Sequence, residues 1–202
     1  MFKRKPSVYI IYCHPSENSI TNIIKEGYIK GLKEKRIHYT INDLYKSNFN
    51  SEISEKEYLR ENYNMPFPLE EDVKTEQKNI NNSDILTFIF PLFWMDAPSK
   101  LVGYFSRVFT KGFNSENEDN IALLKTMKQT NFLISAGRSY NDLERDGKIS
   151  SLKTIFEMDR MNGKSEKTKM YFFDQTTHDK EKILNNRQKY FDRAKEIGRN
   201  TI

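Results

Sequence analysis

Short apolar runs alternate with amphipathic stretches along most of this chain. The runs are rich in β-branched and aromatic residues, a composition typical of buried strands. We expect strands at residues 8–13, 37–44, 84–90, 131–135 and 169–173. The run at 84–90 is apolar almost throughout, which favours a central place in a parallel sheet that is covered on both faces.

Between these runs, apolar residues recur three or four positions apart, which predicts amphipathic helices. Ser19 precedes the first such stretch as a natural N-cap, and Pro98 lies in the first turn of another. The expected helices cover residues 20–34, 98–109 and 150–161, and two polar helices are expected at residues 73–82 and 183–197. Residues 45–74 are expected to be an irregular excursion, of a length that is usually functional or contacts a partner.

Strands that alternate with helices predict an α/β fold with a doubly wound parallel sheet. Right-handed crossovers then place helices on both faces of that sheet, as a three-layer sandwich. Because no internal repeat or linker interrupts the pattern, we expect residues 1–202 to form a single domain. In such sheets, ligands bind at the carboxyl ends of the strands beside the first strand. This rule selects three loops, at residues 14–19, 91–98 and 135–140.

The first loop carries His14, Ser16 and Ser19 and leads into the first expected helix. Backbone N–H groups at a helix N-terminus attract anions, and these side chains add further donors. A phosphate or pyrophosphate is therefore the expected guest, although no GxGxxG pattern is present. A capped helix with an incidental histidine is the alternative for this segment.

The second loop places four large apolar residues in a row, Leu92, Phe93, Trp94 and Met95. Such a row is costly to expose unless something planar covers it, and a heteroaromatic ring would do so. A neighbouring chain packed over the loop is the alternative.

The third loop combines small residues with a phenol. Ser135, Ala136 and Gly137 would let a ring approach the backbone closely. Tyr140 could donate a proton to a reduced acceptor or stabilise negative charge on a reduced ring. An ordinary turn is the alternative for this loop.

Together the three loops resemble those of the flavodoxin-like NAD(P)H:quinone oxidoreductase family. Residues 84–109 are similar to the family's strand, flavin loop and following helix, with Pro91 and Trp94 at matching positions. His14 followed by Ser19 is similar to its phosphate loop. Residues 43–50 resemble the segment after its second strand. The resemblance covers residues 7–140 well and the remainder weakly.

This resemblance implies a flavodoxin-like fold, with a five-stranded sheet in the order 2-1-3-4-5, and a homodimer with its site at the subunit interface. It implies a bound flavin, FAD in preference to FMN, and hydride transfer from NAD(P)H to quinone-like acceptors. Tyr140 is the candidate catalytic residue. The residues expected to contact the cofactor are His14, Ser16, Ser19, Ile20, Thr21, Pro91, Leu92, Phe93, Trp94, Met95, Ser135, Ala136, Gly137 and Tyr140.

Three departures from the family pattern leave the acceptor open. Ile20 and Thr21 stand where the family often has Phe-Asn. The third loop reads Ser135-Ala136-Gly137-Arg138 rather than Thr-Thr-Gly-Gly, and no histidine follows within residues 141–147. Nitro or azo reduction, or service as a flavin-bearing ancillary subunit of a membrane transporter, are the alternatives.

Composition and charge limit the classes of partner and the compartment that we expect for this chain. The formal net charge is +5, but lysine and arginine are interleaved with acidic residues and no zinc spacing occurs, so neither nucleic acid nor a metal is expected. Cys13 is the only cysteine, which excludes an internal disulfide and fits a reducing compartment. Because no apolar signal-peptide core follows the basic start, and the apolar run at 85–95 is too short to span a bilayer, we expect a cytoplasmic protein without membrane insertion.

Overall fold

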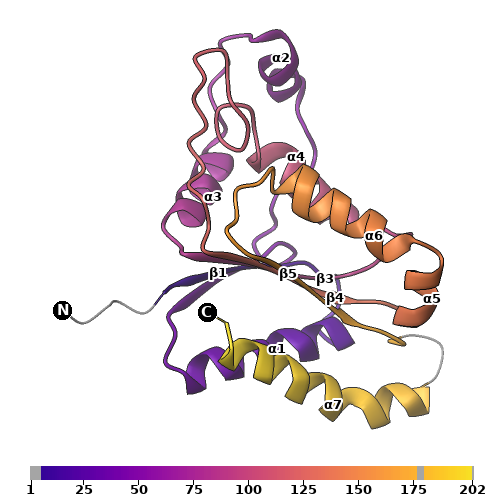
Figure 1. Ribbon diagram of the computed structural model, residues 1–202. Coiled ribbons are helices and arrows are strands. Elements are labelled where there is room, and N and C mark those ends of the chain that lie inside the picture. Colours follow the sequence, from indigo (N-terminus) through magenta and orange to yellow (C-terminus); the bar gives the residue numbers. More distant parts are fainter. Residues whose placement is uncertain (1–5, 177–179, 202) are drawn as a thin grey trace.

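A computed structural model describes residues 6–176 and 180–201 and shows a three-layer arrangement of helices around one sheet (Figure 1). The sheet has the strand order β2-β1-β3-β4-β5, and all neighbouring strands are parallel. Its strands are β1 (Val8–Tyr12), β2 (Tyr39–Asp43), β3 (Ile85–Pro91), β4 (Gln129–Ser135) and β5 (Thr168–Phe173). The predicted flavodoxin-like topology is confirmed.

Helices cover both faces of this sheet. The pair α1 and α7 lies on one face, and α3, α4 and α6 lie on the other (Figure 1). The helices are α1 (Ile20–Glu34), α2 (Glu55–Tyr63), α3 (Glu71–Asn81), α4 (Ser99–Val108), α5 (Tyr140–Arg145), α6 (Lys148–Lys153), a π-helix (Thr154–Arg160) and α7 (Lys180–Arg199). Helices α1 and α7 approach closely at Gly31, which has no side chain. A Cβ there would lie 2.1 Å from the carbonyl oxygen of Lys195.

The apolar pattern places β3 correctly at the centre of the fold. Every residue of β3 and of β4 is buried. On the α4 side, the Phe88 and Phe132 rings stack with centroids 5.2 Å apart, and Phe105 packs 5.0 Å from Phe88. Much of the chain's aromatic content therefore fills the core.

The prediction of an irregular excursion at residues 45–74 was wrong in part. The segment contains α2, which begins with a capping box between Ser54 and Glu57, and the start of α3. Glu57 is the only buried residue of α2, so this helix has no apolar stripe to reveal it. Residues 150–161, expected as one helix, divide into the end of α6 and a π-helix, and α5 was missed.

The excursion is fastened to α4 by a buried arginine. Arg107 Nε donates to Glu57 Oε1 at 2.7 Å, and Nη1 donates to the Asn50 carbonyl oxygen at 2.6 Å. Nη1 and Nη2 also donate to the two carboxylate oxygens of Asp72, at 2.6 and 3.0 Å. Arg107 and Glu57 are each only 2% exposed. These hydrogen bonds act beside one apolar contact, in which the buried Phe49 ring lies 5.1 Å from the ring of Tyr104 on α4.

Candidate functional site

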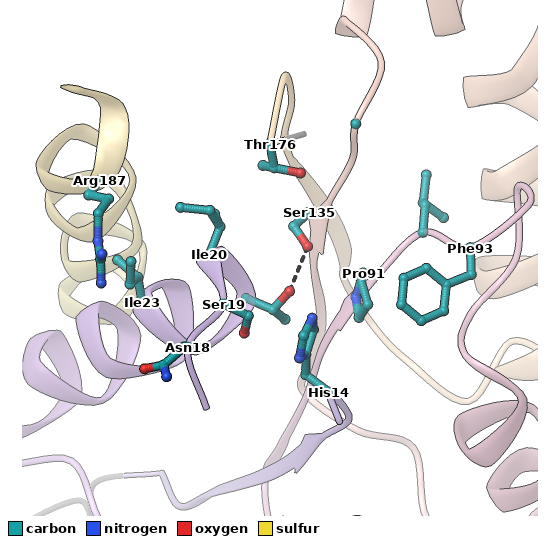
Figure 2. A pocket seen from close by; sticks show the side chains of 13 residues that line it. His14, Asn18, Ser19, Ile20, Ile23, Pro91, Phe93, Ser135, Thr176 and Arg187 are labelled. Atoms are coloured by element: carbon teal, nitrogen blue, oxygen red, sulfur yellow. Dashed lines mark hydrogen bonds between the residues drawn. The ribbon is translucent and has the colours of Figure 1, made fainter. Parts of the chain in front are cut away.

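The three predicted loops meet at the carboxyl ends of β1, β3 and β4 and line two adjoining cavities. The first cavity, of about 260 Å³, lies between the start of α1 and the loop after β3 (Figure 2). It is lined by His14, Asn18, Ser19, Ile20, Thr21, Ile23, Pro91, Leu92, Phe93, Ser135, Gly137, Thr176 and Arg187.

The first cavity offers hydrogen-bond donors at the start of α1. Ser19 caps the helix, and its Oγ accepts from the backbone N–H of Asn22 at 3.1 Å. The N–H groups of Ile20 and Thr21 lie in the first turn, where no helix carbonyl precedes them to accept a hydrogen bond. Since the helix dipole adds partial positive charge here, an anion would be stabilised at this end of the cavity.

His14 adds a ring nitrogen to the same cavity. His14 Nδ1 lies 2.9 Å from both the backbone N–H and the carbonyl oxygen of Ser16, so Ser16 occupies this nitrogen in either tautomer. Burial lowers the pKa of His14, and the backbone contact with Ser16 offsets part of that effect. The imidazole is therefore neutral near pH 7, with Nε2 left to contact a ligand.

Two of the predicted ligand hydroxyls bind each other instead. Thr21 Oγ1 and Ser135 Oγ lie 2.7 Å apart, drawn as the dashed line in Figure 2, and both side chains are buried. This hydrogen bond ties the first turn of α1 to the end of β4. Ser16 does not line the first cavity, and its Oγ accepts from the Asn18 N–H at 3.2 Å.

The second cavity is larger and mostly apolar, at about 690 Å³. It shares Leu92, Phe93 and Gly137 with the first cavity, so the two cavities adjoin, and we call them together the hollow. Its lining is Leu92, Phe93, Trp94, Met95, Ala136, Gly137, Arg138, Leu143 and Lys148. The hollow is thus polar at the end near α1 and apolar at the other end.

Trp94 stands at the tip of a tight turn on the edge of this second cavity. The backbone N–H of Phe93 donates to the Asp96 carbonyl at 2.9 Å, and the reverse bond is 3.0 Å. Trp94 and Met95 between them have φ angles of 51° and 67°. The Trp94 side chain is fully exposed, at 101%. An exposed indole beside an apolar cavity is a surface that a planar ligand or another chain could cover.

Tyr140 lies beside the hollow and is not among the residues that line either cavity. Its hydroxyl donates to Glu144 Oε1 at 3.2 Å, and its backbone N–H donates to Asp174 Oδ2 at 2.8 Å. Burial, and then the charge of Glu144, raise the pKa of Tyr140. Its catalytic role stays a prediction.

Several lining residues were not predicted. Asn18 and Ile23 lie on or beside α1, while Thr176 and Arg187 reach the first cavity from the far end of the chain. No local signal marks Arg187, because only the packing of α7 against α1 brings it there. Arg138 follows the predicted residue Gly137, but the sequence marked it only as a departure from the family pattern.

Residues 6–176 and 180–201 contain neither a metal-binding cluster nor a membrane-spanning helix. No group of three or more histidine, cysteine, aspartate or glutamate side chains there could hold a metal ion. No helix of this described part combines the length and the apolar character needed to cross a membrane.

Comparisons with known proteins show the same architecture. Residues 6–195 match the family model described as a flavodoxin-like fold. The solved NAD(P)H:quinone oxidoreductase from Methanothermobacter marburgensis is 34% identical, with a TM-score of 0.87, over 98% of this chain and 96% of that one. A Bacillus anthracis azoreductase, at 14% identity and a TM-score of 0.72, shares the fold.

Relatives found by sequence carry related names. An uncharacterized NAD(P)H oxidoreductase of Haemophilus influenzae is 32% identical over 146 residues, which are 71% of this chain and 70% of that protein. NAD(P)H dehydrogenase (quinone) 1 of Cavia porcellus is 35% identical over 118 residues, which are 52% of this chain and 43% of that protein. The match thus spans less than half of the Cavia porcellus protein. The chain belongs to the flavodoxin-like NAD(P)H oxidoreductase family, and the resemblance drawn from its three loops is confirmed.

Proposed function

We propose that this chain binds a flavin across the two joined cavities and transfers a hydride from NAD(P)H to a quinone-type acceptor. The observation that carries the proposal is the pair of adjoining cavities, the one beside the N-terminus of α1 more polar than the one beside Trp94. A flavin has the same division, with a planar ring at one end and phosphate at the other. The flavin supplies the two-electron chemistry, and the protein supplies binding and orientation.

The residues present fit such a group. His14 Nε2 and the first N–H groups of α1 would hold a phosphate, because none of them has to give up an internal hydrogen bond. Gly137 presents no side chain where the two cavities join, so a ring can approach the backbone there. Leu92 and Phe93 would exclude water from one edge of the ring.

We propose FAD rather than FMN as the flavin. A phosphate on the N-terminus of α1 would occupy only part of the first cavity, which continues along α1 past Ile23 to Arg187 (Figure 2). The Arg187 guanidinium, at the far end of this cavity from the first phosphate, suits a second phosphate. Ile20 and Ile23 offer apolar surface to an adenine. Arg187→Gln should therefore weaken FAD binding about tenfold and leave FMN binding within about twofold. Equal losses for both flavins would remove this argument for FAD.

We further propose that a second copy of the chain covers the apolar end of the hollow. The support is the fully exposed indole of Trp94 and the width of the apolar cavity beside it. Light scattering of the purified protein should give twice the monomer mass, and Trp94→Glu should shift it toward the monomer. We keep the cytoplasm as the proposed location, since the free thiol of Cys13 fits a reducing compartment.

Tyr140 remains the proposed residue for steadying charge near the reduced ring or for delivering a proton. To act there, its hydroxyl would have to exchange its contact with Glu144 for one with the ring. Tyr140→Phe should keep its flavin and lose turnover, while Glu144→Gln should leave turnover nearly unchanged. Unchanged turnover in Tyr140→Phe would remove Tyr140 from the mechanism.

The decisive experiment is an absorbance spectrum of the purified protein. Flavin bands that bleach on anaerobic addition of NADH or NADPH, and return on addition of a quinone, are the expected result. A colourless protein that takes up neither FAD nor FMN when they are supplied would overturn the proposed function.

A further inference from the structure

The turn that carries Trp94 has a backbone conformation that neither of its central residues favours. With φ angles of 51° and 67°, Trp94 and Met95 both occupy the left-handed region, where glycine and asparagine are the usual residues. Neither side chain of this pair can hydrogen-bond its own backbone as asparagine does. Such a conformation persists only where its surroundings hold it, and it often lies at a functional site.

Asp96 closes this turn and ties it to the body of the protein. Besides the two backbone hydrogen bonds with Phe93, its Oδ1 accepts from the Ala97 N–H at 2.7 Å. The same oxygen accepts from Arg160 Nη2 at 2.8 Å. The ion pair is half-buried, since the Arg160 side chain is 12% exposed and that of Asp96 is 44% exposed.

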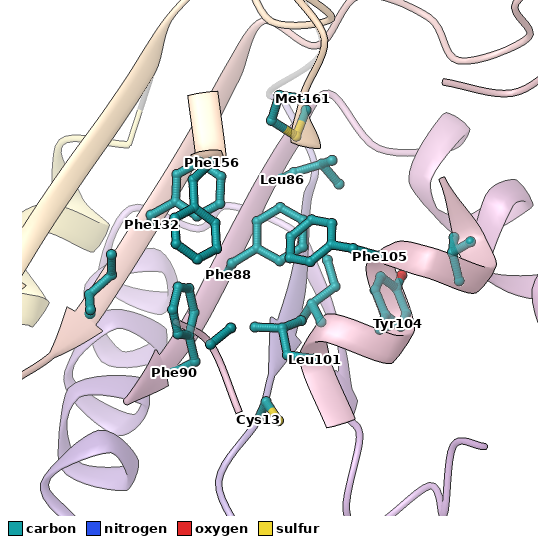
Figure 3. Packing of buried hydrophobic residues seen from close by; sticks show 14 of the residues in the cluster. Cys13, Leu86, Phe88, Phe90, Leu101, Tyr104, Phe105, Phe132, Phe156 and Met161 are labelled. Carbon is teal, nitrogen blue, oxygen red and sulfur yellow. The ribbon is translucent and has the colours of Figure 1, made fainter. Parts of the chain in front are cut away.

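Arg160 itself has little freedom. Its guanidinium lies 5.0 Å from the centroid of the Phe105 ring and 4.4 Å from that of Phe156. Figure 3 shows both rings as part of the buried aromatic cluster. The carbonyl oxygen of Arg160 also accepts from Asn114 Nδ2 at 3.1 Å. The guanidinium thus contacts two core rings, and its Nη2 donates a hydrogen bond to the turn.

The backbone around Arg160 is also unusual. Arg160 is the last residue of the π-helix, a rare element that frequently lies at functional sites. The wider turn of this helix shifts its side chains from the positions that an α-helix would give them. Arg160 Nη1 is buried and has no hydrogen-bond partner among the described residues. A buried donor without a partner costs free energy, so the role of Arg160 is more than to fill space in the core.

We propose that the Asp96–Arg160 ion pair is a clamp that holds the strained Trp94–Met95 turn in the conformation that receives the flavin ring. Both are positioning residues, because neither lines either cavity. The inference rests on the proposed function for the identity of the ligand. Without the clamp, the turn would relax in the free protein, and each binding event would have to restore the strained conformation.

A double-mutant cycle separates this role from simple packing. Asp96→Asn keeps the shape of the side chain and should weaken FAD binding about tenfold. Met95→Gly removes the strain at one of the two positions, so Asp96→Asn should cost less than about threefold when made in that background. Arg160→Gln should behave like Asp96→Asn in both backgrounds. Loss of a purely structural contact would weaken binding equally in both.

A second measurement needs no flavin. Because Trp94 is the only tryptophan, its fluorescence anisotropy in the flavin-free protein reports on this turn alone. Asp96→Asn and Arg160→Gln should lower that anisotropy. Glu71→Gln, which breaks the exposed Glu71–Lys74 pair on α3, is the matched control and should change nothing.

Two results would overturn the clamp: unchanged Trp94 anisotropy in Asp96→Asn, or the same loss of flavin affinity with and without Met95→Gly. A wild-type protein that binds no flavin would instead overturn the proposed function. In that case the anisotropy measurement still decides whether the ion pair holds the turn.

Discussion

Replacing Arg107 by methionine tests how the segment at residues 45–74 is attached to the fold. Methionine replaces the aliphatic part of arginine and packs well, but it leaves the Glu57 carboxylate without its cation. Glu57 is 2% exposed, so water cannot replace the lost partner. Removing one member of a buried ion pair costs about 3–5 kcal/mol.

This loss is large compared with the whole stability of a domain, which is about 5–15 kcal/mol. With a urea m-value of about 2 kcal/mol/M, the unfolding midpoint should fall by about 1.5–2.5 M. Lys100→Met is the matched control, because Lys100 also binds this segment, through one hydrogen bond to the Phe49 carbonyl oxygen at 2.6 Å. Loss of that single charged hydrogen bond should cost about 1.5–3 kcal/mol.

The pH dependence identifies the cause. Burial alone would raise the pKa of Glu57, but the hydrogen bonds from Ser54 and Arg107 hold it below the ordinary value. In Arg107→Met, burial is opposed only by Ser54, so the pKa of Glu57 should rise and its carboxyl should take up a proton more readily. The difference in the free energy of unfolding from wild type should therefore shrink on acidification. Adding Glu57→Gln should recover part of the loss, and a loss below about 1 kcal/mol, or no recovery, would refute the reasoning.

Three further predictions concern the site. Thr21→Val leaves Ser135 Oγ buried without a partner and should lower the free energy of unfolding by about 1–3 kcal/mol, whereas Ser106→Ala, at an exposed hydroxyl, should change it little in the same urea titration. Because burial lowers the pKa of His14 and a bound phosphate would raise it, FAD affinity should increase as the pH falls through the pKa of His14 in the complex and level off below its pKa in the free protein, and His14→Asn should abolish that slope. Burial raises the pKa of Cys13 to about 12, so the native protein should not react with a thiol reagent at pH 8, whereas the urea-unfolded protein should react fully.

The sheet and the place of the site were predictable because both depend on local patterns. Each strand is marked by its own apolar run, and in a parallel sheet the order of elements is enough to bring the ends of β1, β3 and β4 together. The three loops chosen by that rule do line one hollow.

The features that were missed depend on contacts between distant residues. Helix α2 buries only Glu57, and a buried glutamate looks like a surface residue in any hydropathy pattern. The partner of this glutamate is Arg107, fifty positions further along the chain. Arg187 likewise reaches the first cavity only because α7 packs on α1. Sequence patterns show which face of an element is apolar, but they do not name the residue on the other side of a contact.

The same limit decides which predicted ligand contacts matter. The sequence identifies hydroxyls able to bind a ligand, yet Thr21 and Ser135 already bind each other, and Tyr140 already binds Glu144. A group that must break an internal hydrogen bond to reach a ligand gains little, because one bond is exchanged for another. His14 Nε2 and the first N–H groups of α1 give up nothing when an anion arrives. The binding energy at the polar end of the hollow should therefore come from these donors, and the two buried hydroxyls should act by holding α1 against β4.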